Sequence, residues 1–424
     1  MLDIQKIRAE HETVRQGVAK KNMDIDFAPI LELDQRRRDV IAEVEVLKHK
    51  RNVVSRDVAT RKKNQEDASD LIDETRKIGQ DIKRLDEDQR TVEAELNDLL
   101  LQVPNLPHPS TPVGRDASEN PTIKNWGERR NVEYQRLTHL ELGENLGLFD
   151  FPRGTKIAGP GFPLYTGRGA RLERALINFM LDFHTEKHGY TEVLPPVMSN
   201  TRSMTTTGQL PKFDDDMYKI PRDELFLIPT AEVPVTNIHQ SETIPAVDLP
   251  IKYCAYSSCF RREAGSYGKD TRGFLRLHQF NKVELVKFTH PDDSYDELEK
   301  LRTDAEDILQ ALGLEYRVIE LVTGDLSFAA AKCYDIELWA PGEEKWLEVS
   351  SCSNFEDFQA RRGNIKFKPR EGGKPQLLHT LNGSGVATPR LLVALLETYQ
   401  QQDGSIQLPE VLSPYMGSAG LLLT

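Results

Sequence analysis

The feature that most constrains the fold is a proline-free stretch, residues 30–103, in which apolar side chains recur every seven residues. In its first half, one row contains Leu33, Val40, Leu47 and Val54, and a second row contains Val44 and Val58. In its second half, the rows contain Ile78, Leu85, Val92 and Leu99, and Ile82 and Leu96. Rows with this spacing are the a and d positions of a coiled coil. Because the polar stretch 61–70 separates the halves, we predict two long helices folded back on each other as an antiparallel hairpin.

Positive charge is concentrated on the first of these predicted helices. Between Leu47 and Lys63 the only acid is Asp57, and the cations are Lys48, Lys50, Arg51, Arg56, Arg61, Lys62 and Lys63. A solvated coiled-coil surface would explain this distribution, and so would a basic ridge that binds the backbone of an RNA. Arg37 and Arg51 fall on a seam row, which favours a role for some cations besides packing.

Length and composition limit the class of protein. A chain of 424 residues predicts two domains. No apolar run approaches the length of a membrane span, and the N-terminus lacks the pattern of a signal peptide, so we expect a cytoplasmic protein with no membrane partner. The four cysteines fit neither a metal site nor a disulfide framework, which predicts reduced, structural thiols. A net charge of -12 argues against a protein that coats nucleic acid over its whole surface, but permits a local basic patch.

The helical pattern ends in a segment, residues 103–114, that contains four prolines and marks a boundary. We therefore predict a helical domain over 1–103 and a mixed domain over 104–424. The second domain has a helical pattern over 170–189, and alternating stretches that predict strands over 190–196, 274–288, 332–340 and 345–354. Polar turns rather than regular helices join these strands, which favours an antiparallel sheet and an α+β fold.

One turn of the predicted sheet, residues 259–288, is rich in arginine and lies between apolar flanks. Arg261 and Glu263 are two residues apart at an expected strand end, so we predict that both face the same side of the sheet. The connecting loop adds Lys269 and Arg272, and Phe280 and Glu284 follow on the returning strand. Guanidinium, aromatic ring and carboxylate on one face suit a nucleoside phosphate together with an amine. From the residues alone, an exposed salt-bridged hairpin explains the pattern equally well.

Longer motifs separate these alternatives. FRREAG at 260–265, with RLHQFNKVE at 276–284, resembles motif 2 of the class II aminoacyl-tRNA synthetases, in the form used by seryl-tRNA synthetases. GYTEVLPP at 189–196 and GSGVATPRLLVALLE at 383–397 resemble motifs 1 and 3. Stretches that resemble the seryl branch specifically are TGQLPKF at 207–213, PTAEVP at 229–234, EVSSCSNFEDFQARR at 348–362 and HTLNGSG at 379–385. The resemblance covers nearly the whole chain and implies an antiparallel-sheet class II catalytic core with an N-terminal antiparallel coiled-coil arm.

The resemblance also implies roles for individual residues. Arg261 and Arg390 would be the catalytic cations. The residues that would bind ATP are Arg261, Arg262, Glu263, Leu277, Phe280, Glu348, Val349, Ser350, Ser351 and Arg390. The residues that would bind serine are Thr230, Ala231, Glu232, Arg261, Glu284, Asn382 and Ser384. Oxygen donors suit a hard cation, and the implied Mg²⁺ ligands are Glu348 and Ser351. On the arm, the expected tRNA contacts are Lys48, Arg51, Arg56 and Arg61.

The activity implied is ATP-dependent attachment of L-serine to tRNA(Ser) through a seryl-adenylate, by a homodimer with tRNA bound across its two subunits. Whether tRNA(Sec) is also charged is left open. One alternative is a related ligase that loads a carrier protein, but such a ligase should lack a full basic arm. Another is a coiled-coil interaction protein with an inactive core, which would require losses at Arg261, Glu284, Glu348 or Arg390, and all four are present. A zinc-dependent seryl enzyme would have a cysteine ligand and a different N-terminal domain.

Overall fold

The computed structural model describes residues 1–264, 272–370 and 372–424. The chain divides into two compact units, one formed by residues 1–19 and 23–104 and the other by residues 20–22 and 105–424. Within the described ranges, none of the helices has both the length and the apolar character needed to cross a lipid bilayer.

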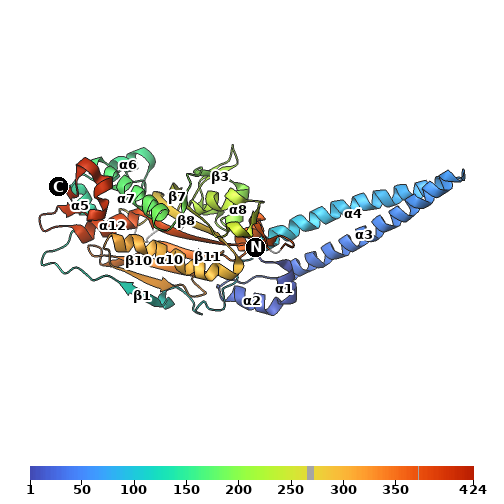
Figure 1. The fold of residues 1–424 in the computed structure, drawn as a ribbon, viewed down its shortest axis with the longest axis horizontal. Coiled ribbons are helices and arrows are strands. Elements are labelled where there is room, and N and C mark those ends of the chain that lie inside the picture. The colour runs from blue at the N-terminus through green and yellow to red at the C-terminus, as the bar shows by residue number, and fades with distance from the viewer. Residues whose placement is uncertain (265–271, 371) are drawn as a thin grey trace. The chain divides into compact units, whose positions relative to one another are not determined.

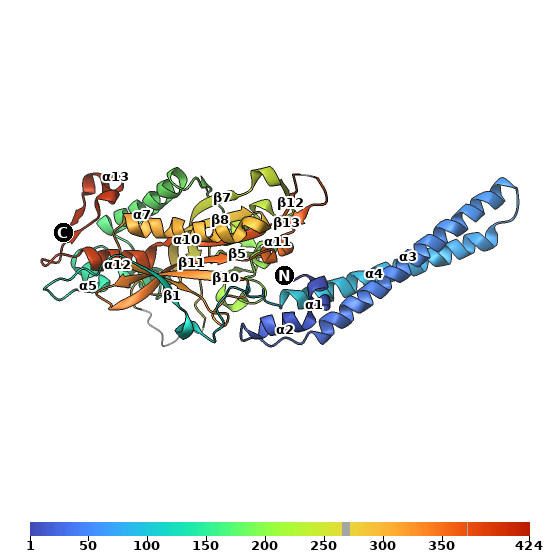
Figure 2. The ribbon, with the colours of Figure 1, turned by 60° about the horizontal axis from the view of Figure 1, so that its bottom comes forward.

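The first unit is built on two long antiparallel helices, α3 (Ala28–Lys63) and α4 (Ser69–Leu101), which run side by side in Figures 1 and 2. The predicted helical hairpin is therefore confirmed. Its buried seam is formed by Val40, Val44, Val54, Ile78, Ile82, Leu85, Val92, Leu96 and Leu100. Four residues expected in the seam are only half-buried: Leu33, Leu47, Val58 and Leu99. At the last of these, Leu100 is buried instead. A helix with 3.6 residues per turn drifts from a seven-residue repeat, which moves the contact by one position.

Two short helices that the sequence analysis did not predict precede the hairpin: α1 (Ile4–Ala9) and α2 (His11–Ala19). Near them lies Asp34 of α3, a completely buried carboxylate. It accepts hydrogen bonds from Arg8 at 2.6 Å, Arg37 at 2.9 Å and Arg38 at 3.2 Å. Arg37 therefore has a structural role in the seam, which is to pair with Asp34. A buried carboxylate without a cationic partner is strongly destabilising.

The second unit contains an eight-stranded sheet with the order β1-β9-β10-β11-β14-β8-β7-β2. All neighbouring strands are antiparallel except β2 and β7, which confirms the antiparallel prediction. The strand expected over 190–196 is short, because Pro195 and Pro196 have no N–H group to donate to a ladder. In sheet order the strands are Thr122–Trp126, Tyr316–Glu320, Lys332–Ala340, Lys345–Asn354, His379–Ala387, Gln279–Thr289, Ile251–Phe260 and Thr191–Glu192.

The two faces of this sheet pack against different helices. Helices α7 (Gly167–Glu186), α10 (Ser294–Ala311) and α12 (Thr388–Tyr399) form the main core together with Val283 and Leu285 of β8. Val286 and Phe288 belong to a separate core cluster with α9 (Glu232–Thr236) and α11 (Phe358–Gly363). Side chains alternate along a strand, so the even-numbered residues of β8 point away from the main core. This face carries the candidate site.

Shorter elements complete the second unit. The helices are α5 (His139–Asn145), α6 (Phe151–Ala158), α8 (Thr201–Thr207) and α13 (Ser413–Met416). Small sheets are formed by β3 (Met198–Asn200), β5 (Leu225–Leu227) and β4 (Lys219–Ile220), by β13 (Gln376–Leu377), β12 (Lys366–Lys368) and β6 (Thr243–Pro245), and by β15 (Ile406–Gln407) and β16 (Leu422–Leu423). All four cysteines are free and buried, as predicted.

Candidate active site

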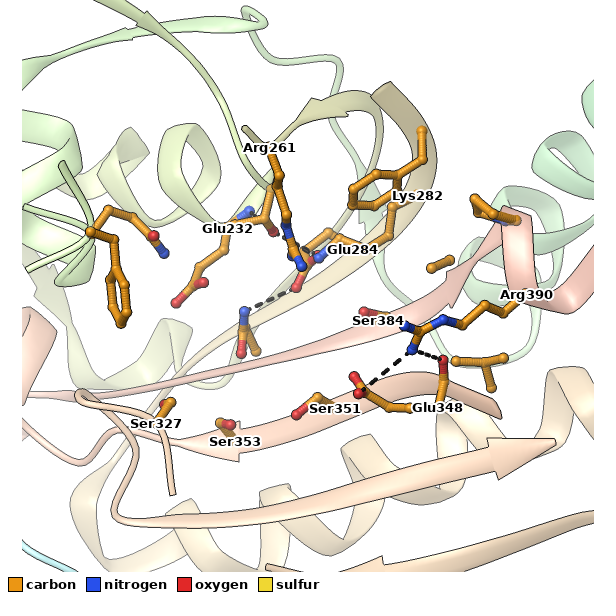
Figure 3. Close-up of a pocket in the computed structure, with 18 of the residues that line it drawn as sticks. Glu232, Arg261, Lys282, Glu284, Ser327, Glu348, Ser351, Ser353, Ser384 and Arg390 are labelled. Carbon is orange, nitrogen blue, oxygen red and sulfur yellow. Dashed lines mark hydrogen bonds and ion pairs between the residues drawn. The ribbon is translucent and has the colours of Figure 1, made fainter. Parts of the chain in front are cut away.

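A cavity of about 470 Å³ opens on the sheet face that carries the even-numbered residues of β8. Its walls come from β8, β11 and β14, from the start of α12, and from the loops at 207–213 and 327–329. Figure 3 shows Arg261, Lys282 and Glu284 near its centre, and Arg390 and Ser327 toward opposite ends. Segments far apart in the sequence thus converge on one pocket, as the motifs predicted.

The centre of the pocket is a hydrogen-bonded network around Glu284, which is 1 % exposed. One carboxylate oxygen accepts from the Thr230 hydroxyl and the other from the Asn382 amide, each at 3.0 Å. Lys282 forms an ion pair with Glu284 and donates to the Thr230 hydroxyl at 2.8 Å. These bonds fix the carboxylate in one orientation, ready to receive an ammonium group or a hydroxyl. The sequence analysis missed Lys282, although alternation along the strand places it on the same face as Glu284.

A second acid, Glu232 at the start of α9, also lines the pocket. Burial, followed by the nearby charge of Glu284, raises the pKa of the Glu232 carboxyl to about 7. The Gln359 amide donates to it at 2.6 Å, an interaction that the sequence did not reveal. A carboxyl poised near neutrality can change its charge when a cation enters the pocket.

Arg261 enters the pocket differently from the prediction. Strand β7 ends at Phe260, so the expected placement of Arg261 and Glu263 on one strand face is wrong. Glu263 adopts a left-handed backbone conformation with φ of 51°, and it forms an ion pair with Arg276. Both Arg261 and Glu263 nevertheless line the cavity, with the Arg261 guanidinium 5.2 Å from the centre of the Phe280 ring. The expected loop cation Lys269 lies outside the described residues, and Arg272 is exposed.

At the other end of the pocket, Arg390 of α12 lies next to Glu348 of β11 (Figure 3). Its guanidinium donates to the Glu348 carbonyl at 2.8 Å and lies 3.7 Å from the Glu348 carboxylate. It also donates to the Leu275 carbonyl at 3.3 Å. The Glu348 side chain is 48 % exposed, so its ion pair with Arg390 is weak. Arg390 could therefore leave Glu348 and bind a phosphate group.

A bulge places Glu348 and Ser351 on the same face although they are three residues apart. Opposite these residues, Ile336 pairs with Ser350 and Glu337 pairs with Glu348, so β11 contains one extra residue. Asp335 hydrogen-bonds to Ser351, and burial raises the pKa of the Asp335 carboxyl, with a further contribution from Glu348. Carboxylate and hydroxyl oxygens are the donors that a hard divalent cation prefers, so Glu348 and Ser351 fit such an ion.

Most of the predicted site residues line the cavity, including Leu277, Val349 and Ser384. Three do not. Ala231 is buried in the second core cluster, and the Ser350 hydroxyl donates to the Ser384 carbonyl at 2.6 Å. Arg262 is exposed, and its backbone N–H donates to the Asp216 carbonyl.

The basic residues of the arm are partly paired within the first unit. The Lys48 ammonium group lies 3.7 Å from a carboxylate oxygen of Asp86, and the Arg61 guanidinium lies 3.0 Å from a carboxylate oxygen of Asp70. Arg51 and Arg56 have no ion-pair partner among the described residues. Exposed pairs of this kind are weak and exchangeable, so all four cations can still meet an anionic partner.

Comparison with known proteins decides the family. The chain matches the models for the seryl-tRNA synthetase N-terminal domain over residues 1–107 and for the class II tRNA synthetase core domain (G, H, P, S and T) over residues 214–399. A serine-tRNA ligase from Caldicellulosiruptor bescii is 56% identical over 418 residues, which are 99% of each chain. The chain belongs to the seryl-tRNA synthetase family. The corresponding ligase from Geobacter sulfurreducens is 55% identical over 417 residues, 98% of this chain and 99% of that protein.

Among solved structures, the seryl-tRNA synthetase of Pyrococcus horikoshii, complexed with ATP, superposes with a TM-score of 0.92 at 37% identity, covering 100% of this chain and 99% of that chain. Membership of the seryl-tRNA synthetase family makes the chain an aminoacyl-tRNA synthetase, as the motifs predicted. The carrier-protein ligase and the inactive interaction protein are not favoured, since the pocket holds Arg261, Glu284, Glu348 and Arg390 together.

Proposed function

We propose that this seryl-tRNA synthetase family member attaches L-serine to tRNA(Ser), using ATP and a seryl-adenylate intermediate. One observation carries the proposal: a buried carboxylate with fixed hydrogen-bond partners, Glu284, lies in the same cavity as Arg261 and Arg390. The arrangement supplies a site for a small amino acid next to cations suited to a nucleoside triphosphate.

Serine fits the central network through its three polar groups. Its ammonium group would bind near Glu284 and Glu232, and its hydroxyl would exchange hydrogen bonds with Asn382 and Ser384. Its carboxylate would then face Arg261. A pocket that hydrogen-bonds a hydroxyl leaves buried groups unpaired when alanine binds, which is the physical basis for rejecting alanine.

ATP would bind along the other half of the cavity. Its base would stack on Phe280, Arg261 would contact the α-phosphate, and Arg390 would exchange its Glu348 contacts for the γ-phosphate. Glu348 and Ser351 would hold Mg²⁺, which neutralises phosphate charge when bound. The serine carboxylate attacks the α-phosphorus, a P–O bond forms, and pyrophosphate leaves, with Arg261 stabilising the charge that develops.

In the second step a ribose hydroxyl at the 3′ end of the tRNA attacks the acyl carbon of the adenylate. The new ester bond forms, the hydroxyl proton is released and AMP leaves. No side-chain nucleophile is needed, and positioning contributes most of the rate.

We further propose that residues 1–103 bind tRNA, through Lys48, Arg51, Arg56 and Arg61, and that residues 104–424 catalyse both steps. A homodimer is supported by the exposed apolar side chains next to the short edge strand β2, where Leu194 is 81% exposed and Val197 and Met198 are also exposed. Since its acceptor is a tRNA, the enzyme would work in the cytoplasm.

The test is ATP–pyrophosphate exchange with each of the twenty amino acids, followed by charging of tRNA(Ser) and tRNA(Sec) transcripts. We expect exchange with serine only, and charging of tRNA(Ser). An Arg51→Glu/Arg56→Glu variant should retain exchange and lose charging, whereas the matched Arg51→Gln/Arg56→Gln variant should lose less. Absence of exchange with any amino acid, in a folded sample supplied with Mg²⁺, would refute the proposal. Exchange with serine without charging by the intact protein would indicate another acceptor.

A further inference from the structure

One wall of the active-site cavity, residues 274–277, is neither helix nor strand. Phe274, Leu275 and Leu277 line the cavity here, on the segment that leads into β8 and to the Phe280 ring. Buried backbone groups outside a sheet or helix have no ladder partners and need other ones. The position of this wall, on the ATP half of the cavity, therefore depends on residues elsewhere in the chain.

Helix α12 holds the wall at two adjacent residues. The Arg390 guanidinium donates to the Leu275 carbonyl at 3.3 Å. Glu397 lies two turns further along the same face of α12 and reaches Phe274 through the ring of His139. His139 begins α5, which packs beside α12 in Figures 1 and 2. The wall is thus connected to α12 both directly and through a histidine.

The hydrogen bonds of His139 determine where its ring proton lies. The side chain is completely buried, and Nε2 accepts a hydrogen bond from the Phe274 backbone N–H at 3.4 Å. Because Nε2 is the acceptor, the ring proton lies on Nδ1. Nδ1 donates to the Glu397 carboxylate at 3.2 Å and lies 3.3 Å from the Glu343 carboxylate. The acids therefore select the tautomer that offers an acceptor to the wall.

Glu397 is itself held in one orientation. Its buried carboxylate accepts hydrogen bonds from the backbone N–H groups of Gly342 at 2.8 Å, His139 at 2.9 Å and Glu343 at 3.1 Å. Three backbone donors prevent the carboxylate from turning away from the His139 ring.

The side chains of His139, Glu343 and Glu397 are also close enough together to hold a metal ion. A metal on Nδ1 would require that nitrogen to lose its proton, and the proton on Nε2 would then face the Phe274 N–H. The hydrogen bonds in the structure therefore favour a positioning role over metal binding.

Close packing brings the wall directly against this histidine. Gly273 has a φ of 60°, and a β-carbon at this position would clash with Nε2 of His139. The Phe274 ring lies in an aromatic cluster, with its centre 4.6 Å from that of Phe149 and 5.4 Å from that of Tyr165. These ring contacts bury the side chain, and the hydrogen bond to His139 fixes the direction of the backbone.

We infer that His139 is a positioning residue for the ATP side of the cavity, and that Glu397 acts through it by keeping the ring proton on Nδ1. The inference rests on the proposed function. Loss of the acceptor would leave the buried Phe274 N–H unpaired, and the wall would have to move to find another partner. The serine side of the cavity should not respond, because the partners that hold Glu284 come from other segments of the chain.

The experiment compares two amides that replace different ring nitrogens of His139. Glutamine can place its side-chain oxygen near the position of Nε2 and accept from Phe274, whereas asparagine reaches only the position of Nδ1. In His139→Asn the KM for ATP in serine-dependent pyrophosphate exchange should rise about 10-fold or more, and the KM for serine should stay at the wild-type value. His139→Gln should recover much of the loss. The matched control is His49→Asn, because His49 is exposed on α3.

A second variant tests the contribution of Glu397. Glu397→Gln removes the charge that holds the ring proton on Nδ1, so it should also raise the KM for ATP. In the double variant with His139→Asn, the combined effect should be smaller than the product of the single effects, because both changes break the same connection.

Three results would overturn the inference. One is a KM for ATP that is unchanged in a folded His139→Asn variant, and another is an equal rise in the KM values for ATP and serine. The third is calorimetric binding of Zn²⁺ to the wild-type enzyme that is lost in both His139→Asn and Glu397→Gln, which would identify a metal site. If the wild-type enzyme shows no serine-dependent exchange, the proposed function itself fails. Calorimetric titration of the same variants with ATP would then still test the role of His139, so the two failures are distinguishable.

Discussion

Replacement of Glu232 by glutamine should stabilise the catalytic unit above neutral pH. Burial and the neighbouring Glu284 raise the pKa of Glu232 from 4.5 to about 7 in the folded protein. Such a shift corresponds to a cost of about 3 kcal/mol for the ionised carboxylate. Glutamine has nearly the same shape, and its oxygen can accept the hydrogen bond from Gln359.

The sign of the effect follows from the protons bound in each state. Between pH 4.5 and about 7, folded Glu232 keeps its proton and the unfolded residue does not. The contribution of Glu232 to stability is therefore complete below pH 4.5 and is lost as the pH rises through about 7. Glutamine does not titrate, so the variant's free energy of unfolding, relative to wild type, should increase by about 3 kcal/mol between the acidic and the alkaline limit.

The assay is urea-induced unfolding followed by tryptophan fluorescence at about pH 4, 7 and 8.5. All three tryptophans, at 126, 339 and 346, lie in the catalytic unit, so the signal reports that unit alone. Glu133→Gln, at an exposed position, is the matched control and should show no pH-dependent difference. A Glu232→Gln variant whose relative stability is constant with pH, or falls at alkaline pH, would show that Glu232 is ionised in the pocket and would refute the reasoning.

Three further predictions follow from the site and the arm. Arg261→Lys should lower the rate of serine-dependent exchange by about 100-fold or more, because a single ammonium group cannot replace a bidentate contact with the α-phosphate. Glu284→Gln should raise the KM for serine by about 10-fold or more and leave the KM for ATP nearly unchanged, as pyrophosphate exchange at varied substrate concentrations will show. Leu96→Ala, in the buried seam of the arm, should lower the stability of the hairpin by about 3 kcal/mol, measured by far-ultraviolet circular dichroism, and should raise the KM for tRNA without altering exchange.

The long helical hairpin was predictable because its seven-residue repeat is a direct consequence of helix geometry. The period identified most of the seam, but Leu33, Leu47, Val58 and Leu99 are only half-buried, and the buried neighbours are Asp34 next to Leu33 and Leu100 next to Leu99. Helices α1 and α2 were missed, because six and nine residues are too few for a period to be recognised. The buried Asp34 was missed for a related reason, since a charged residue in an apolar row can be understood only when its cationic partners are known.

The site shows where periodic reasoning fails. Catalytic groups here lie where regular structure is interrupted: Arg261 follows the end of β7, and Glu348 and Ser351 share a face only because β11 has an extra residue. Strict alternation would have placed Glu348 and Ser351 on opposite faces of the sheet. The motifs located these residues because a motif records which side chains occur together and does not depend on the period of the backbone.

The contacts of supporting residues are not visible in the sequence, even for Lys282 and Gln359, which lie inside the motif stretches at 276–284 and 348–362. Lys282 could have been found by alternation from Glu284, but Gln359 reaches Glu232 across 127 positions of sequence. Lys21 lies 309 positions from the Ala330 carbonyl that it contacts. In the sequence it is one lysine beside another, Lys20, and only the fold distinguishes the buried side chain from the exposed one. Contacts of this length turn a set of motif residues into a cavity with defined walls, and Lys21 shows that such a contact can come from a residue outside every recognised motif, because its ammonium group donates to carbonyls of the 327–330 wall.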